Sequence, residues 1–186
     1  MSRTIYCDTS DLGKLITKFE TELSQPTMRR AMASALNKTL GYVGAETKRE
    51  VNKEYAVPRS ITKALTEKRA TSSRLEAVAK YQDSPLPLFL FKYRAASNRY
   101  RSPVSVMVKR SNGMKTHTGS NPAMFKAYGN KIKLRDTGQR NIRGAYTVSI
   151  PQMVANEEVY DEIAKKAEVR LYKNLEHELE WRLSKL

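Results

Sequence analysis

The residue types that most often perform catalysis are few in this sequence and poorly spaced for it. His117 stands between two threonines and His177 between two glutamates, and neither has a second histidine at metal-ligand spacing. Cys7 is the only cysteine and has no histidine near it in the chain. We therefore expect both histidines at the surface, and we expect no enzyme activity, no metal and no cofactor.

A row of three glutamates is the one other arrangement that suggests acid-base or metal chemistry. Glu46, Glu50 and Glu54 are spaced by four residues, which puts them on one face of a helix. Arg49 and Lys53 lie beside them and can pair with them. We interpret the row as a solvated helix face.

Positive charge in the middle of the chain is the strongest chemical signal. The formal net charge of +15 is large for 186 residues and points to nucleic acid, an acidic surface or a charged assembly. Thirteen Lys and Arg lie between Lys92 and Arg143 against the single Asp136, a net of 13 − 1 = +12. The charge is therefore concentrated in one segment.

Two interpretations of this segment remain open. In the functional one, eight cations contact DNA or an acidic partner: Arg99, Arg101, Lys109, Arg110, Lys115, Lys131, Lys133 and Arg135. Tyr93, Tyr100 and Tyr128 are interleaved with them and could stack on bases. In the other, the segment is a solvated basic sheet face and a flexible hairpin that keep the protein soluble. No RNA-recognition, helix-turn-helix or zinc-finger pattern is recognisable here.

Strands are predicted to carry these cations. Alternation of valines at positions 104–108 predicts a strand, 111–113 supply a turn, and 114–118 return as the partner of a hairpin with Lys109 and Arg110 near its tip. In 131–135, cations alternate with Ile132 and Leu134, which predicts an edge strand with a basic exposed side. Further strands are predicted at 72–81 and at 86–91.

Helices are predicted at the start of the chain. Apolar residues at helical spacing predict a first helix between Ser10 and Pro26, and a second runs from Thr27 to about Tyr55. Gly41 and Gly44 interrupt the second helix, and we interpret them as packing sites at which it could bend. A short helix with Ile61 and Leu65 inward is expected after Pro58.

The end of the chain predicts a short strand, Tyr146 to Ile150, that Pro151 terminates, followed by a long helix with Asn156 as its N-cap. A row of apolar residues at a spacing of four runs along this helix: Val159, Ile163, Ala167, Leu171, Leu175, Leu179 and Leu183. Such a row rotates by roughly 240° over its length. Either the protein's own core covers all of it, or its second half packs on something else. We expect Leu179, Trp181 and Leu183 to contact an adjacent subunit.

Together these elements predict one α+β domain, with terminal helices packed on a mainly antiparallel sheet of about four or five strands. Its parts are a helical N-terminal region (1–66), strands with the basic hairpin (70–150) and the C-terminal helix (151–186). The apolar content of 40% fits a globular protein. No signal core or membrane span is expected.

Four stretches of the chain resemble a known family in sequence and in order. They are MRRAMASALNKTLGYVGAETKREVNKEYAVPRSITKAL, RLEAVAKYQDSPLPLFLF, VSVMVKR and SIPQMVANEEVYDEIAKKAEVRLYKNLEHEL. Their arrangement resembles the phage minor tail protein Z family, the tail-completion proteins of long-tailed phages, over about residues 27 to 180. The chain departs from the family at 121–125, where it has Asn-Pro-Ala-Met-Phe in place of a Gly-Ala-Phe type motif.

This resemblance implies a structural protein without catalytic residues at the head-proximal end of the tail. It implies a ring, expected to be a hexamer, around the DNA channel, which completes the tail for head-tail joining and genome passage. The implied partners are further copies of the chain, tail terminator, tail tube or head-tail connector proteins, and packaged DNA, with no membrane. The implied location is the host cytoplasm during assembly and then the virion neck. The alternative is a free basic nucleic-acid-binding protein of the ribosome- or nucleoid-associated type.

Overall fold

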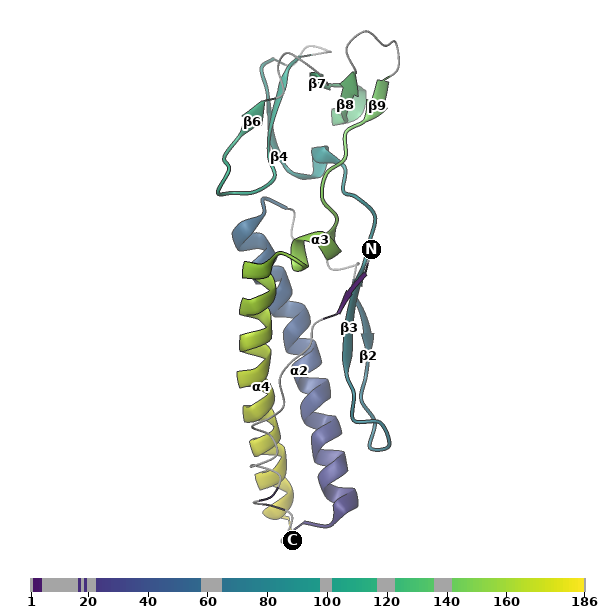
Figure 1. Cartoon of the computed structure of the whole chain (residues 1–186), viewed down its shortest axis with the longest axis vertical. Coiled ribbons are helices and arrows are strands. Elements are labelled where there is room, and N and C mark those ends of the chain that lie inside the picture. Colours follow the sequence, from purple (N-terminus) through teal and green to yellow (C-terminus); the bar gives the residue numbers. More distant parts are fainter. Residues whose placement is uncertain are drawn as a thin grey trace.

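Two long helices and a β-rich end give the chain an elongated shape (Figure 1). The computed structural model describes residues 2–4, 17, 19, 23–57, 65–97, 102–116, 123–135 and 142–185. Helices α2 and α4 pack side by side in opposite directions, and we call this pair the stalk. Residues 86–97, 102–116, 123–135 and 142–148 form the opposite end, which we call the head. Long helices with antiparallel sheets confirm the predicted α+β class.

Helix α2 (Gln25–Glu54) confirms the predicted second helix. Pro26 lies in its first turn, where the missing N–H costs no hydrogen bond. The helix ends at Tyr55, which is extended, as is expected shortly before Pro58. Gly41 and Gly44 do not interrupt α2, which is one unbroken helix. Gly44 marks a close approach, because a Cβ there would lie 2.9 Å from Cδ2 of Leu65.

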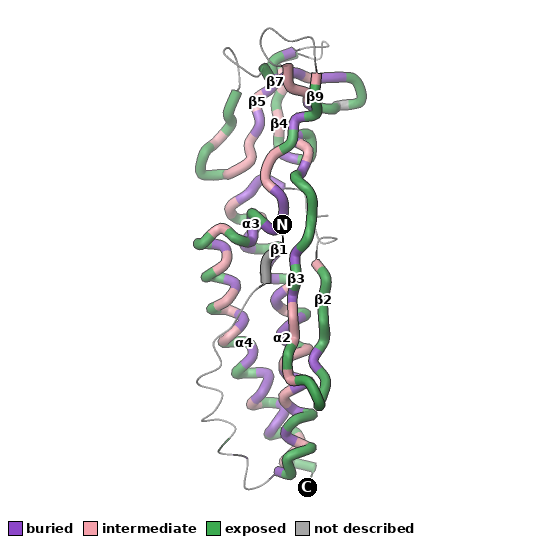
Figure 2. Tube along the Cα trace, turned by 45° about the vertical axis from the view of Figure 1, so that its right-hand side comes forward, coloured by how far each residue is buried: buried purple, intermediate pink, exposed green. Residues whose placement is uncertain are grey.

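Helix α4 (Glu157–Leu183) begins where the sequence predicts. The side chain of Asn156 accepts a hydrogen bond from the backbone N–H of Glu158 at 3.2 Å, so the predicted N-cap is confirmed. Figure 2 shows that buried residues of both helices lie where α2 and α4 face each other. No helix in the described part of the chain has the length and apolar character needed to cross a membrane.

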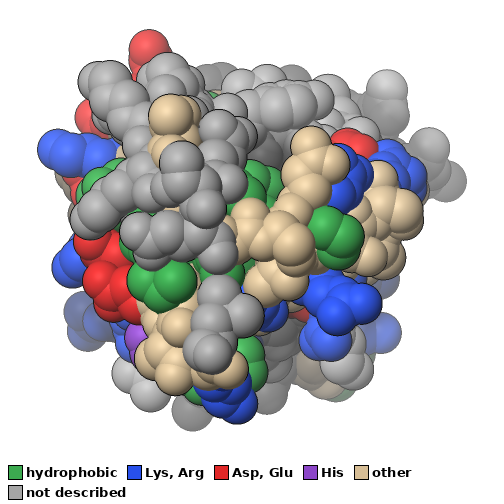
Figure 3. Space-filling model, turned by 90° about the horizontal axis from the view of Figure 1, so that it is seen from below, with side chains coloured by type: hydrophobic (Ala, Val, Ile, Leu, Met, Phe, Trp, Pro, Cys, Tyr) green, Lys and Arg blue, Asp and Glu red, His purple; other side chains and the backbone are tan. Residues whose placement is uncertain are grey.

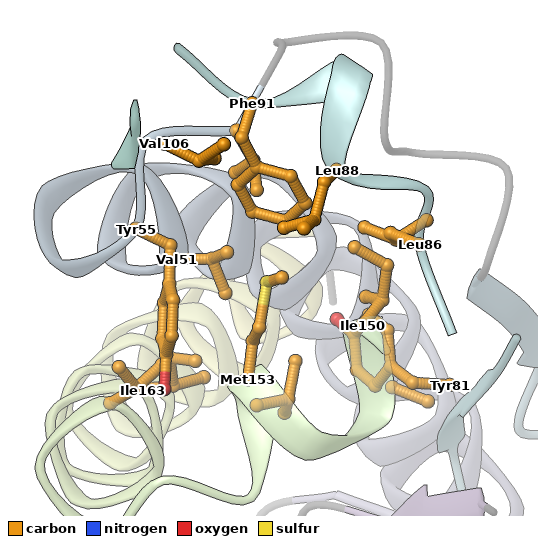
Figure 4. Packing of buried hydrophobic residues seen from close by; sticks show 14 of the residues in the cluster. Val51, Tyr55, Tyr81, Leu86, Leu88, Phe91, Val106, Ile150, Met153 and Ile163 are labelled. Carbon is orange, nitrogen blue, oxygen red and sulfur yellow. The ribbon is translucent and has the colours of Figure 1, made fainter. Parts of the chain in front are cut away.

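The apolar row of α4 is covered by the chain's own residues along its length. Its first three members belong to a large cluster where stalk and head meet, together with Tyr55, Phe91 and Met153 (Figure 4). Leu171, Leu175 and Leu179 belong to a second cluster with the start of α2 and with Phe19 and Leu23. The first of the two alternatives therefore holds for this row. The predicted first helix otherwise lies outside the described residues.

Helix α3 (Ile150–Val154) replaces the end of the predicted strand at 146–150, so that prediction is wrong. Ser149 and Gln152 form a capping box, and Pro151 sits in the first turn. Proline starts this helix because its fixed φ already suits a helical first turn. Tyr146 forms only an isolated antiparallel bridge, with Pro87.

A three-stranded antiparallel sheet lies beside α2 in the order β1 (Ser2–Thr4), β3 (Val78–Gln82), β2 (Leu65–Lys68). Of the strand predicted at 72–81, only the second half forms a strand in the structure, as part of β3. Strand β3 buries Ala79 and Tyr81, and the Tyr81 hydroxyl donates to Thr47 Oγ1 at 2.7 Å. Leu65 begins β2, so its predicted place in a helix is wrong.

The head contains two more three-stranded antiparallel sheets. One has the order β4 (Lys92–Ala95), β5 (Val104–Met107), β6 (Lys115–Thr116), and the other β7 (Ala123–Lys126), β8 (Ile132–Arg135), β9 (Ile142–Gly144). A bridge between Pro103 and Phe125 joins them. The β5–β6 hairpin is confirmed, and Gly113 in its turn has a φ of 63°.

Two predictions for the head are wrong. Strand β8 is central rather than an edge, because β9 pairs with its other side. The apolar run 86–91 forms the short 3-10 helix η2 (Leu88–Leu90) instead of a strand. Its turn is closed by hydrogen bonds such as that from Leu90 N to Pro87 O. A second 3-10 turn, η3 (Tyr128–Asn130), lies between β7 and β8.

Candidate functional site

Two of the predicted contact residues hold the β5–β6 hairpin against the end of α2. Lys109 Nζ lies 3.0 Å from Glu54 Oε1 and 5.8 Å from the centre of the Tyr55 ring. Arg110 donates from Nε to the carbonyl of Asn52 at 2.9 Å and from its backbone N–H to the carbonyl of Glu54 at 2.8 Å. These contacts satisfy carbonyls that the last turn of a helix leaves without partners.

The carboxylate of Glu54 offsets part of the charge on Lys109. The hydrogen bond between Glu54 and the ammonium raises the pKa of Lys109. Burial lowers this pKa by a smaller amount, so the pKa is raised overall. The lysine is thus fully protonated at neutral pH, but it is paired within the chain. Lys109 and Arg110 therefore have a structural role that the sequence did not predict, and contact with a polyanion would compete with that role.

The other predicted contact residues occupy different environments. Lys115 on β6 and Lys131 before β8 are exposed, whereas Lys133 is half-buried. The guanidinium of Arg135 lies 5.9 Å from the centre of the Phe125 ring, which allows a cation–π contact. Arg99 and Arg101 lie outside the described residues. The described contact residues therefore all lie on the head. They do not line one exposed face of a strand.

Further cations share the head and were not singled out from the sequence. Lys92 and Arg94 are exposed on β4, Lys126 is half-exposed on β7, and Arg143 is exposed on β9. Of these residues, Lys92 and Arg94 could have been identified from the sequence, because they alternate along the chain as residues on one face of a strand do. Ten described cations belong to the head: Lys92, Arg94, Lys109, Arg110, Lys115, Lys126, Lys131, Lys133, Arg135 and Arg143. No carboxylate side chain lies in the described part of the head, so its potential is positive.

A cavity of about 280 Å³ opens between the hairpin and the second sheet of the head, and we call it the head pocket. Five of its lining residues are apolar and buried or half-buried, and we call them its floor: Leu88, Val106, Val108, Met124 and Leu134. Its remaining lining residues are mostly polar: Lys109, Asn112, Gly113, Lys115, Tyr146 and Thr147. An apolar floor with cations beside it suits a group that is apolar at one end and anionic at the other.

The predicted subunit-contact residues differ in accessibility. Leu179 has no exposed surface in its own chain, so its expected place in a contact between subunits is corrected. Leu179 is buried because the second cluster packs around it. Leu183 is half-buried against the same cluster, whereas Trp181 is 47% exposed and stacks with Lys185, whose Nζ lies 3.9 Å from the ring centre.

The outer surface of α4 exposes apolar side chains that the sequence did not single out. Val169 is 54% exposed and Tyr172 is 40% exposed. A shallow cavity of about 310 Å³ next to them is lined largely by cations: Tyr42, Glu162, Lys165, Lys166, Val169, Arg170 and Lys173. Seen from the C-terminal end of the stalk, the described hydrophobic side chains form only small areas among polar and charged ones (Figure 3).

The glutamate row on α2 is largely buried, so its interpretation as a solvated face is wrong. Glu46 and Glu50 are only 4% and 6% exposed because α4 covers them. Lys166 of α4 approaches both, with Nζ 2.7 Å from Glu46 Oε1 and 2.5 Å from Glu50 Oε1. Burial raises the pKa of Glu50, but hydrogen bonds from Lys166 and Lys53 more than offset this, and the net pKa is lowered. The row serves helix packing.

A second polar cluster lies nearer the free end of the stalk. Buried Glu178 accepts from Ser34 Oγ at 2.9 Å and pairs with Lys38 at 2.6 Å and with Arg182. Burial raises the pKa of Glu178, yet these partners outweigh burial and hold the pKa at about 2. Two polar clusters on matching turns of α2 and α4 favour one register, because any shift would leave buried charges without partners.

Metal-ligand chemistry has little support in the described residues. They contain no group of three or more His, Cys, Asp or Glu that could hold a metal ion. His177 is exposed on α4, and His117 and Cys7 lie outside the described residues.

Comparisons with protein-family models, with curated proteins and with solved structures find no match to this chain. A functional proposal therefore depends on the sequence stretches quoted above and on the geometry of the head and stalk.

Proposed function

We propose that this chain is a structural virion protein that completes the head-proximal end of a phage tail. Copies of it would form a ring around the DNA channel for head-tail joining and genome passage. The proposal starts from the sequence stretches that resemble the minor tail protein Z family. It requires no catalytic residue, metal or cofactor.

The observation that carries the proposal is the separation of charge along the molecule. The ten described cations of the head have no described carboxylate among them, whereas the described carboxylates belong to the stalk, to the sheet beside it and to the connecting residues. A ring of such heads would face the channel with a belt of positive charge. Such a belt suits either DNA phosphates or an acidic neighbouring ring, and both contacts weaken as salt rises.

The stalk suits lateral packing in such a ring. A helix of 27 residues is about 40 Å long, and polar clusters fix its register against α2. Exposed Val169, Tyr172 and Trp181 on α4 supply apolar contact area of the kind that protein interfaces use. A rigid helix pair with a few exposed apolar side chains can set the distance between subunits.

The role can be tested on phage particles produced without this protein. Tails should reach full length and infectivity should collapse, because a completion protein acts after tube polymerisation. Supplying the purified chain to such particles should restore infectivity. Tails without a tube, or tails of uncontrolled length, would contradict the proposal and would identify a tube subunit or a length regulator.

Free nucleic-acid binding is the second candidate, and one feature favours it. Tyr128 is 81% exposed and follows Lys126 closely in the chain, an arrangement that could stack on a base while neutralising a phosphate. A free binder should bind duplex DNA or RNA tightly as a monomer or dimer in fluorescence anisotropy. A tail-completion protein should instead assemble on isolated tail ends and show only weak, salt-sensitive affinity for free duplex.

A further inference from the structure

We propose that the head pocket binds an acidic, apolar segment of a partner protein. One apolar side chain of that segment would enter the pocket, and flanking carboxylates would meet the cations beside it. The inference uses the geometry of the head alone and does not depend on the proposed role in a tail.

The floor of the pocket is apolar and is built from separate, well-packed elements. Leu88 comes from η2, Val106 from β5 and Met124 from β7, and all three side chains are buried. Val108 and Leu134 complete the floor and also pack against the main cluster. A volume of about 280 Å³ is at the low end for small-molecule sites, so it suits one large apolar side chain.

The surroundings of the pocket select for negative charge. Lys115 is exposed beside the floor, and Lys109 lines the pocket while it pairs with Glu54. Among the described residues, neither the lining nor the rest of the head contains a carboxylate. A carboxylate placed here would form a charge-assisted hydrogen bond with Lys115, and the general potential of the head would speed its approach.

A protein segment fits this site better than a nucleic acid does. Phosphates gain nothing from an apolar floor. Bases stack best on aromatic faces, and Tyr146 is the one aromatic residue in the described lining, whereas the five floor residues are aliphatic or Met. Strand β6 is the last strand of its sheet in the described part of the chain, and its Lys115 also lines the pocket, so a segment extended along β6 would pass the pocket. An extended peptide could therefore pair with β6 while one side chain enters the pocket.

Fluorescence anisotropy with labelled peptides tests this inference on the purified full chain. The probe is a short fluorescein-labelled peptide with one central Phe flanked by Asp and Glu. Two control peptides carry Ser in place of Phe, or Lys in place of the acidic residues. The acidic Phe peptide should bind in a salt-dependent manner, and each control should bind at least about tenfold more weakly, a difference that anisotropy resolves well.

Two variants of the chain locate the binding site. Thr147→Trp introduces a large ring among the lining residues and should fill the pocket, and Lys115→Glu reverses the charge beside it. Each should weaken binding of the acidic Phe peptide by about tenfold. Lys126→Glu is the matched control, because it makes the same charge reversal on the head at a residue outside the pocket lining. Binding of the peptide to this variant should stay within about threefold of the original. Circular dichroism establishes that each variant is folded.

Several outcomes would overturn the inference. One is equal binding of the Phe and Ser peptides, which would mean that the floor is not used. A second is full binding by both folded pocket variants. A third is binding of a short DNA duplex that both variants abolish while the acidic peptide does not bind, since the pocket would then belong to a nucleic-acid surface. Failure of Thr147→Trp to fold would leave Lys115→Glu, an exposed position, to decide.

Discussion

The ammonium of Lys166 lies 2.7 Å from the carboxylate of Glu46, which joins α4 to α2 at a buried position. Glu50 shares the same lysine, and both hydrogen bonds raise the pKa of Lys166. Lys166→Met should therefore lower the free energy of unfolding by about 2 kcal/mol, because two carboxylates lose a partner that a methionine cannot replace. Urea denaturation measures this change.

Lys165 offers the control for that experiment. It is the exposed neighbour of Lys166, so Lys165→Met should change the free energy of unfolding by no more than about 0.5 kcal/mol. Adding Glu46→Gln and Glu50→Gln to Lys166→Met should recover part of the loss, since neutral amides cost less to bury than unpaired carboxylates. Equal effects of Lys166→Met and Lys165→Met would show that the buried pairs contribute nothing.

Glu178 predicts a pH dependence of stability. Its pKa is about 2 in the folded chain against an ordinary value of 4.5 for a glutamate, so the unfolded chain binds its proton more tightly. The stabilisation is therefore present at neutral pH and is lost as the pH falls from about 5 towards 2. Glu178→Gln should remove about 2 kcal/mol at pH 7 and make stability less dependent on pH over that range. Thermal unfolding at several pH values would contradict this if both proteins showed the same dependence.

The two glycines of α2 should respond differently to the same substitution. A Cβ at Gly41 meets nothing within 4 Å, so Gly41→Ala should stabilise the protein by about 0.5 to 1 kcal/mol through helix propensity. At Gly44 the same Cβ would lie 2.9 Å from Leu65, which must move. Gly44→Ala should therefore gain less, and Gly44→Val should destabilise. Melting temperatures of the three variants provide the test, and equal gains from both alanines would disprove the close approach of β2.

The hairpin cations should separate into structural and exposed residues. Lys109→Gln removes the pair with Glu54 and should cost up to about 1 kcal/mol, because the pair is only partly exposed. Amide exchange in 104–116 should become faster, since the hairpin loses one of its anchors on α2. Lys115→Gln, at an exposed position, should change neither quantity. Exchange that is equally slow in both variants would show that backbone contacts alone hold the hairpin.

The sequence predicted those features that depend on neighbouring residues. Asn156 as N-cap, the extent of α2 and the turn at Gly113 follow from local rules, and all three are confirmed. Features that depend on distant residues were missed. The burial of Glu46 depends on α4, which is about 120 residues away in the chain, and the central place of β8 depends on β9. The prediction at Pro151 was wrong for a third reason. A proline can end a strand or begin a helix, and the local sequence does not distinguish the two.

Leu179 and Trp181 should separate folding from assembly, although they are only two residues apart. Leu179 is fully buried against α2, Phe19 and Leu23, so Leu179→Asp should unfold the stalk by burying an unpaired charge. Ile163→Asp in the first cluster should do the same.

Trp181 is 47% exposed, so Trp181→Asp should leave circular dichroism unchanged while it weakens association between copies in sedimentation. The ring proposed above needs such a contact on the stalk. A folded Trp181→Asp protein that assembles as well as the original would place that contact elsewhere, and Val169 and Tyr172 would be the next residues to change.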